Sequence, residues 1–196
     1  MDKKKLSERD ICSKFITPAI VQAGWDLHAQ IREEVSFTKG RIIVRGKLHS
    51  RGEQKRADYI LYYKSNIPLA VIEAKDNSHS VGAGMQQALN YAETIGVPFV
   101  FSSNGDAFLL HDRTGRAEKT EQELSLSAFP SPAELWQRYC QWKGLESADA
   151  RHTVEMPYYD DGTGRAPRYY QANAINNTVE AVAKGQQRIL LVMATG

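Results

Sequence analysis

Hydrophobic and polar positions along the chain follow helical periodicity in several stretches, which predicts amphipathic helices. Helices are expected over four ranges: 7–22, 81–95, 132–142 and 171–184. In the first of them, Ser7 and Asp10 have the spacing of a capping box, and Pro18 should bend or break the helix near Thr17. Gly96 stands where the second helix should end.

Short apolar or β-branched runs predict strands between these helices. Strands are expected over six ranges: 41–44, 58–63, 69–74, 98–101, 107–110 and 188–193. Turn residues at 64–68 separate two of the runs, so 58–63 and 69–74 should pair as an antiparallel hairpin. Residues 144–167 show no periodicity, which predicts a connection between two units. The order of elements indicates a mixed α/β fold around one sheet.

The composition is that of a globular protein. Of 196 residues, 42% are hydrophobic and 24% are charged. No apolar run approaches the roughly 18 residues of a membrane-spanning helix, and the charged start is not followed by a secretory hydrophobic stretch. Cys12 and Cys140 belong to no CxxC pair, which argues against a metal ribbon or a disulfide framework and favours the cytoplasm.

The net charge of +2 is uninformative, but its distribution is uneven. Between residues 39 and 56 a single acid, Glu53, stands among these bases: Lys39, Arg41, Arg45, Lys47, Arg51, Lys55 and Arg56. Two interpretations remain open at this point. The run is either a solvated edge of a strand and loop or a stripe that contacts nucleic-acid phosphates.

The predicted hairpin carries the residues with the clearest chemistry. Glu73 and Lys75 are two positions apart, so both project from one face of a strand, while Ala74 points the other way. Asp58 lies on the partner strand, and the register that would bring it to the same face is not fixed by the sequence. With that register, two carboxylates and a backbone carbonyl would suit Mg²⁺. Otherwise Asp58 would form a surface salt bridge with Arg56 or Lys75.

Two further side chains belong to this hypothesis. Beside a bound cation, Lys75 would orient the attacking water or stabilise negative charge on a phosphate. Gln87 and Tyr91 are four residues apart and share a helix face. That face either packs in a half-buried helix or presents both side chains to the site.

Three segments, 56–61, 72–75 and 87–91, resemble in order and spacing the nuclease domain of type I restriction enzymes. More closely, the chain is similar to the N-terminal part of their restriction (motor) subunit, HsdR. The resemblance implies a PD-(D/E)xK nuclease fold followed by a superfamily 2 helicase or translocase.

The site residues implied by that resemblance are the following. Asp58 and Glu73, with the Ala74 carbonyl, become metal ligands, and Lys75 becomes the catalytic lysine. Gln87 and Tyr91 form the QxxxY motif and would contact DNA or support the nuclease site. Ala57 stands where the motif usually has proline. Glu8 is the candidate for an additional acid from the first helix, or simply a carboxylate at a helix N-terminus.

The end of the chain resembles the start of a helicase domain. Tyr170 and Gln171 resemble the adenine-reading Q motif, and 190–196 resembles the strand before a phosphate-binding loop. The expected organisation is a nuclease domain at 1–150, a linker at 151–167 and a truncated motor domain at 168–196. We expect the chain to stop before the nucleotide-binding lysine, so ATP would serve the full-length subunit and not this chain.

The function implied by the resemblance is Mg²⁺-dependent cleavage of double-stranded DNA, coupled in the full-length subunit to ATP-driven translocation. The expected partners are DNA and the modification (methyltransferase) and specificity subunits, in a bacterial or archaeal cytoplasm. Two alternatives remain. One is a non-catalytic DNA-binding or docking module, and the other is a different PD-(D/E)xK nuclease, for repair or junction resolution.

Overall fold

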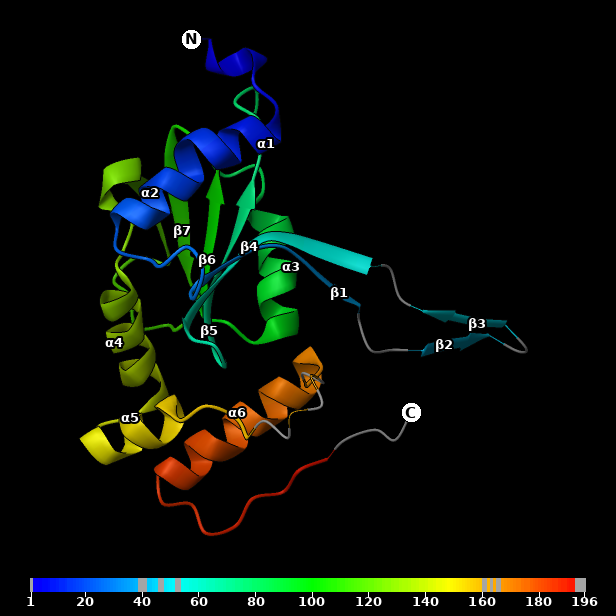
Figure 1. Ribbon diagram of the computed structural model, residues 1–196, viewed down its shortest axis with the longest axis vertical. Helices are drawn as coiled ribbons and strands as arrows, with labels where there is room; N and C mark the ends of the chain where they lie inside the picture. The colour runs from blue at the N-terminus through cyan, green and yellow to red at the C-terminus, as the bar shows by residue number, and fades with distance from the viewer. Residues whose placement is uncertain are drawn as a thin grey trace.

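The structure is a computed structural model that describes residues 2–38, 42–45, 48–51, 54–159, 162, 164 and 167–192. Within those residues six strands form one mixed sheet, and helices cover both of its faces (Figure 1). The mixed α/β class predicted from the order of elements is confirmed.

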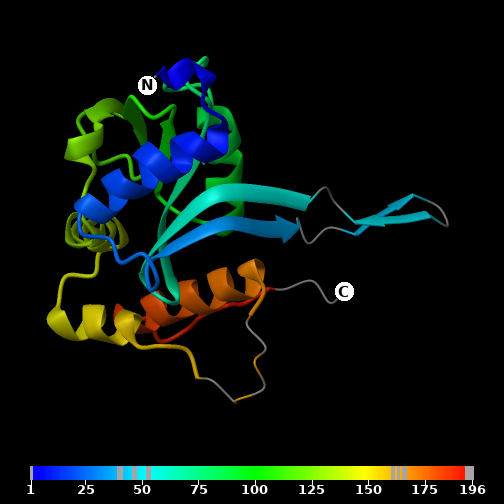
Figure 2. The ribbon, with the colours of Figure 1, turned by 45° about the horizontal axis from the view of Figure 1, so that its top comes forward.

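The main sheet has the strand order β1-β4-β5-β6-β7-β8, and β2 and β3 pair separately. The strands are β1 Ile31–Thr38, β2 Ile42–Arg45, β3 Leu48–Arg51, β4 Gln54–Lys64, β5 Ile67–Ala74, β6 Phe99–Ser103, β7 Ala107–Asp112 and β8 Glu121–Ser125. β4 and β5 are antiparallel, as the sequence predicts, whereas β5 and β6 are parallel. β1 and β4 continue beyond the body as a ribbon that points toward β2 and β3 (Figure 2).

Helices form two layers around this sheet. The helical segments are η1 Lys3–Lys5, α1 Glu8–Ile11, η2 Cys12–Ile16, α2 Thr17–Gln22, α3 Met85–Ile95, η3 Leu126–Ala128, α4 Pro132–Lys143, α5 Ala148–Glu155 and α6 Tyr169–Ala183. α1, η2, α2 and α4 pack against one face, and α3 packs against the other (Figure 1).

Alternation along β5 divides its side chains between these two layers. Ile72 and Ala74 belong to the core under α2 and α4, whereas Val71 belongs to the core under α3. Glu73 is two residues beyond Val71, so its side chain points to the α3 side of the sheet.

The first helix is continuous despite its proline. The Ser7 side chain accepts from the Asp10 N–H and the Asp10 side chain accepts from the Ser7 N–H, which confirms the predicted capping box. The expected break near Thr17 appears instead as the π-helical segment η2, in which the Thr17 N–H donates to the Cys12 carbonyl. The wider turn lets the chain accommodate Pro18, which has no N–H to donate.

The strand predicted over 188–193 is wrong for the residues that the structure describes. Residues 188–192 are coil, and Leu190 and Val192 are 88% and 82% exposed. An apolar run becomes a strand only when neighbouring strands satisfy its backbone and cover its side chains. No strand within the described ranges pairs with this segment.

Other differences also have local causes. The second predicted helix begins at Met85 instead of residue 81, because the glycines at 82 and 84 favour turns. Residues 148–155, predicted to be part of an aperiodic connection, form α5, capped by the Ser147 side chain. The sequence did not predict β1, β3 or β8, and β8 is polar and mostly exposed.

The C-terminal helix α6 packs on the rest of the molecule. Asn176 Nδ2 donates to the Asn66 carbonyl, and Lys143 Nζ lies 2.8 Å from Glu180 Oε2. Residue 150, the predicted end of the nuclease domain, lies within α5, and the three-part division of the chain stays a prediction. The described residues include no helix with the length and apolar character needed to cross a membrane.

Candidate active site

The hairpin register brings Asp58 and Glu73 together. Tyr59 pairs with Ile72, so the next pair toward the end of β5 is Asp58 with Glu73. Residues paired across antiparallel strands share a face. Asp58 Oδ2 accepts a hydrogen bond of 2.8 Å from the Ala74 N–H, which holds its carboxylate against the end of β5.

Glu73 is a buried acid with an incomplete set of partners. The residue is 2% exposed, and its Oε1 accepts a hydrogen bond from Lys75 Nζ at 2.9 Å. Its Oε2 is buried and has no hydrogen-bond partner among the described residues. Burial, with the charge of Asp58 nearby, raises the pKa of Glu73 to about 7 despite the opposing effect of Lys75. Burial also raises the pKa of Asp58.

Lys75 links this pair to the first helix. Its Nζ lies 3.7 Å from Glu8 Oε2 on α1. Burial works to lower the pKa of Lys75, but the hydrogen bond to Glu73 and the charges of Glu73, Glu8 and Asp58 outweigh it and raise the pKa overall. Lys75 is therefore held as a cation. Glu8 also lies in the first turn of α1, where its negative charge interacts favourably with the helix dipole. Its position therefore agrees both with an additional acid of the cluster and with a carboxylate at a helix N-terminus.

The donor atoms fit a hard divalent cation. Within the described ranges no group of three or more His, Cys, Asp or Glu side chains is arranged to hold a metal ion. The predicted set is smaller, with carboxylates from Asp58 and Glu73 and the Ala74 carbonyl. All are oxygen ligands, as Mg²⁺ prefers. The unpartnered Glu73 Oε2 supports the fit, because a buried oxygen without a ligand or donor costs free energy.

The helix α3 lies over the same face of the sheet. Gln87 is exposed, and its Nε2 donates to the Tyr91 hydroxyl at 2.8 Å. Burial raises the pKa of Tyr91, and the charges of Glu73 and Asp58 raise it further, which places this phenol within electrostatic reach of both acids. The structure thus brings Gln87 and Tyr91 to the side of the sheet that carries the cluster.

Two predicted features lie apart from this cluster or outside the description. The side chains of the basic run from Lys39 to Lys55 are outside the described residues. Arg56, at its end, lies 3.7 Å from Glu34 Oε2. Gln171 is exposed at the start of α6, where its Oε1 accepts from the Arg168 N–H.

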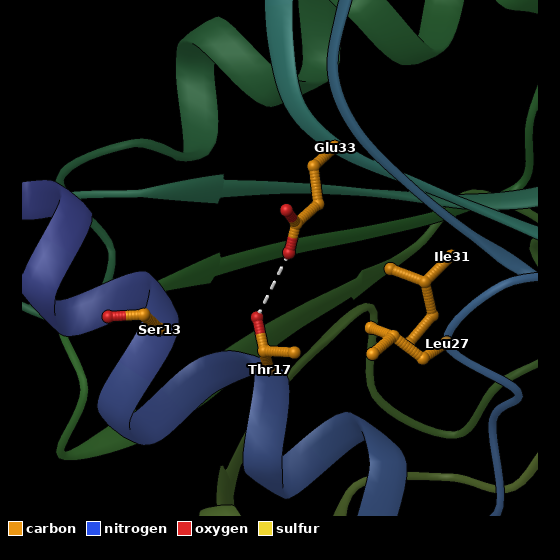
Figure 3. A pocket seen from close by; sticks show the side chains of 5 residues that line it. All are labelled: Ser13, Thr17, Leu27, Ile31 and Glu33. Atoms are coloured by element: carbon orange, nitrogen blue, oxygen red, sulfur yellow. Dashed lines mark hydrogen bonds between the residues drawn. The ribbon is translucent and has the colours of Figure 1, made fainter.

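A pocket between the first helix and β1 does not belong to the site (Figure 3). It is lined by Ser13, Thr17, Leu27, Ile31 and Glu33. Thr17 Oγ1 donates to Glu33 Oε1 at 3.2 Å. Glu33 pairs with Tyr59, whose ring is in the core under α2, so this pocket opens on the opposite face from Glu73.

Sequence analysis missed two residues that touch the cluster. Gly84 packs against the Glu73 side chain, and Ser102 is the β6 residue opposite Glu73. The sequence did contain a signal, because two glycines at 82 and 84 precede a helix that needs neither.

Comparison with known proteins identifies the family. The family model described as type I restriction enzyme R protein N terminus matches residues 27–130. The chain is also 53% identical, over its whole length, to the type I restriction enzyme EcoAI endonuclease subunit of Escherichia coli. The chain belongs to the type I restriction enzyme R protein family, as its N-terminal region.

Other relatives extend this assignment. The chain is 25% identical over 193 residues to the type I restriction enzyme EcoKI endonuclease subunit of Escherichia coli strain K12. A solved fragment attributed to the HsdR subunit of a type I restriction enzyme from Vibrio vulnificus YJ016 matches 97% of the chain, with 43% identity and a TM-score of 0.82. The predicted resemblance to HsdR is confirmed. The chain spans 24% of the EcoAI subunit, 16% of the EcoKI subunit and 35% of the solved fragment.

Proposed function

We propose that this chain carries the nuclease centre of a type I restriction enzyme R subunit and hydrolyses phosphodiester bonds of double-stranded DNA with Mg²⁺. One observation carries the proposal. Asp58, Glu73 and Lys75 converge at the end of the β4–β5 hairpin, and one buried carboxylate oxygen of Glu73 has no hydrogen-bond partner among the described residues. The names of the two curated relatives as endonuclease subunits support it.

Each residue of the cluster has a distinct task in this proposal. Asp58, Glu73 and the Ala74 carbonyl would hold Mg²⁺, which when bound polarises the phosphate and lowers the pKa of a bound water. Lys75 stabilises the negative charge that develops on the phosphate. This task suits Lys75 because its raised pKa keeps it protonated and leaves it without a lone pair to act as a base.

Gln87 and Tyr91 support that chemistry from α3. The exposed amide of Gln87 can donate one N–H to Tyr91 and another to a DNA phosphate. The Tyr91 hydroxyl, which accepts from the Gln87 amide, fixes the orientation of that amide. Glu8 balances Lys75 from α1 and is the candidate for a third carboxylate.

In the longer R subunit, cleavage would follow ATP-driven translocation, with Gln171 contributing to the adenine site and with specificity and modification subunits choosing the DNA. Because the chain spans about a quarter of its EcoAI relative, these activities and partners belong to the proposal.

Plasmid cleavage by the full-length subunit, assembled with its partner subunits and Mg²⁺, tests the nuclease assignment. Asp58→Ala and Glu73→Ala should abolish cleavage while DNA binding persists. Glu33→Ala, a β1 carboxylate on the opposite face of the sheet, is the matched control and should cut normally. Normal cleavage by both site variants would leave the docking-module alternative, and cutting by the isolated chain without ATP would favour another nuclease of this fold.

Metal binding can be measured separately on this chain. Mg²⁺ should raise its melting temperature by mass action, because the cation binds the folded site and not the unfolded chain. The Asp58→Ala, Glu73→Ala double variant should lose that response. If it responds like the parent, the ligands lie elsewhere.

A further inference from the structure

The side chain of Glu73 is enclosed by a contact between the start of α3 and β6. Glu73 pairs with Ser102 in the parallel register of β5 and β6. Above them lies Gly84, the residue that precedes α3. These three residues come from three separate elements, and Ser102 is fully buried.

Gly84 is required there by space and not by backbone conformation. Its φ and ψ of −85° and −8° are accessible to any residue. A Cβ at this position would lie 2.8 Å from Glu73 Cγ and 3.0 Å from Ser102 Oγ. The first distance is too short for two carbon atoms, so the Glu73 stem or the loop would have to move, and the second would push the Ser102 hydroxyl away by a few tenths of an ångström. The Gly84 backbone therefore forms one wall of the slot that contains the Glu73 stem.

Ser102 holds that wall in place. Its Oγ accepts a hydrogen bond of 3.0 Å from the Gly84 N–H. Gly84 is the N-cap residue of α3, and its N–H lies before the first intrahelical hydrogen bond, so the β6 hydroxyl supplies the acceptor that the helix cannot. Removing the hydroxyl would leave the Gly84 N–H without its acceptor and would release the loop from the sheet.

The enclosure matters because the Glu73 carboxylate is only partly anchored by its own hydrogen bonds. Lys75 holds Oε1, and Oε2 has no hydrogen-bond partner in the described part of the chain. The orientation of Oε2 therefore depends on how the stem is packed. Some groups orient a metal ligand without touching the metal. Removing such a group typically lowers metal affinity by about 10–100-fold.

We infer that Gly84 and Ser102 are positioning residues, which clamp the stem of Glu73 so that its unpartnered oxygen faces the divalent cation. This inference rests on the proposed function, because it assumes that Glu73 is a metal ligand. It adds two residues, from β6 and from the loop before α3, that do not themselves touch the cation.

Calorimetric titration of this chain with Mn²⁺ as the probe tests the clamp. Ser102→Ala and Gly84→Ala should each weaken Mn²⁺ binding by about 10–100-fold. Ser102→Thr, which keeps the hydroxyl, should bind more tightly than Ser102→Ala. Thermal unfolding is recorded in parallel, because a role in packing alone would lower stability without changing affinity.

The chain supplies matched controls for both positions. Ser103 is as buried as Ser102, but its Oγ donates to the Ala107 carbonyl and accepts from the Gly105 N–H. Gly82 also has a close neighbour, but a Cβ there would meet only the end of the Leu109 side chain, at 2.9 Å. Ser103→Ala and Gly82→Ala should therefore bind Mn²⁺ like the parent.

The outcomes separate the clamp from the metal site itself. Parent-like affinity in Ser102→Ala and Gly84→Ala, or an equal loss in the two controls, overturns the positioning role and leaves the metal site standing. If Ser102→Ala does not fold, the Gly84→Ala and Gly82→Ala pair decides the same question. A parent chain that binds no Mn²⁺ overturns the proposed metal site, and the clamp with it.

Discussion

Two buried glutamates in this molecule, each paired with a lysine, differ in how many of their carboxylate oxygens have a partner. Glu180 on α6 is 3% exposed, and both of its oxygens have partners, the Tyr139 hydroxyl and Lys143 Nζ. Glu73 on β5 is 2% exposed, and only one of its oxygens has a hydrogen-bond partner among the described residues.

Under the proposed function, that difference separates a structural ion pair at Glu180 from a ligand site at Glu73. The pair of Lys143 with Glu180 joins α4 to α6, and both oxygens of Glu180 already have partners, so neither is left to bind a ligand. In the pair of Glu73 with Lys75, one carboxylate oxygen of Glu73 has no hydrogen-bond partner among the described residues. A second acid, Asp58, lies beside it. Such an arrangement is unfavourable when nothing binds, which is why under-satisfied buried groups indicate function.

The largest effect on stability should come from the saturated pair. Lys143→Ala leaves Glu180 buried without its cation and should lower the free energy of unfolding by about 3–5 kcal/mol, measured by urea denaturation. The Mg²⁺ response should be unchanged. Lys14→Ala removes a more exposed i,i+4 pair with Asp10 and should cost much less. Equal costs for the two variants would contradict the assignment of Glu180 as a structural anchor.

Lys75→Ala should have the opposite signature. Cleavage by the assembled full-length enzyme should fall by about 10²–10³-fold, as for loss of one electrostatic contact to the reacting group. Mn²⁺ binding by this chain should persist, because Lys75 is not a ligand. Lys64→Ala, an exposed lysine at the other end of the hairpin, is the control. Undiminished cleavage by a folded Lys75→Ala enzyme would remove Lys75 from the mechanism.

The buried carboxyl group of Glu73 should also make the stability of the chain depend on pH when no metal is present. The pKa of Glu73 is about 7 in the folded chain against an ordinary 4.5. Between those values the unfolded chain loses the proton and the folded chain keeps it. Stability therefore falls as pH rises through this window, by about 3 kcal/mol at about 1.36 kcal/mol per pKa unit.

Urea denaturation in EDTA at pH 5 and pH 8 measures this effect. Glu73→Gln should remove most of the fall, and the raised pKa of Asp58 should leave a smaller one of the same sign. A parent chain that becomes more stable over the same window, relative to Glu73→Gln, would show that Glu73 is ionised without a cation.

The sequence predicted which side chains lie together in this cluster, but it did not predict how deeply Glu73 is buried. The alternation that puts Glu73 and Lys75 on one face of a strand depends only on local geometry. The register that places Asp58 beside Glu73 depends on how the turn between β4 and β5 folds. The close approach of Gly84 to Glu73 depends on how α3 packs on the sheet, and neither can be read from the sequence. Apolar composition predicted β5 correctly and residues 188–193 wrongly, because β5 has strands on both sides whereas 188–192 has no paired strand in the described part of the chain.

The smallest effect is expected at Gln87 and Tyr91, where function and packing are hardest to separate. The Gln87 amide is exposed and donates to the Tyr91 hydroxyl, while Tyr91 is 7% exposed and lies in the core between α3 and the sheet. Gln87→Ala and Tyr91→Phe should therefore change stability little, because one removes an exposed group and the other keeps the buried ring. Each should lower cleavage by about tenfold, the lower end for groups that support a metal site.

A double-mutant cycle on the assembled enzyme sharpens this prediction. If the Gln87–Tyr91 hydrogen bond is the unit that acts, the double variant should lose little more than either single variant. Gln86→Ala, an adjacent exposed glutamine on a different helix face, is the matched control and should cleave normally. ATP hydrolysis and translocation should persist in the two single variants, the double variant and the control, because they depend on the longer subunit. Fully additive losses would separate the two residues, and normal cleavage by both would return this helix face to a packing role.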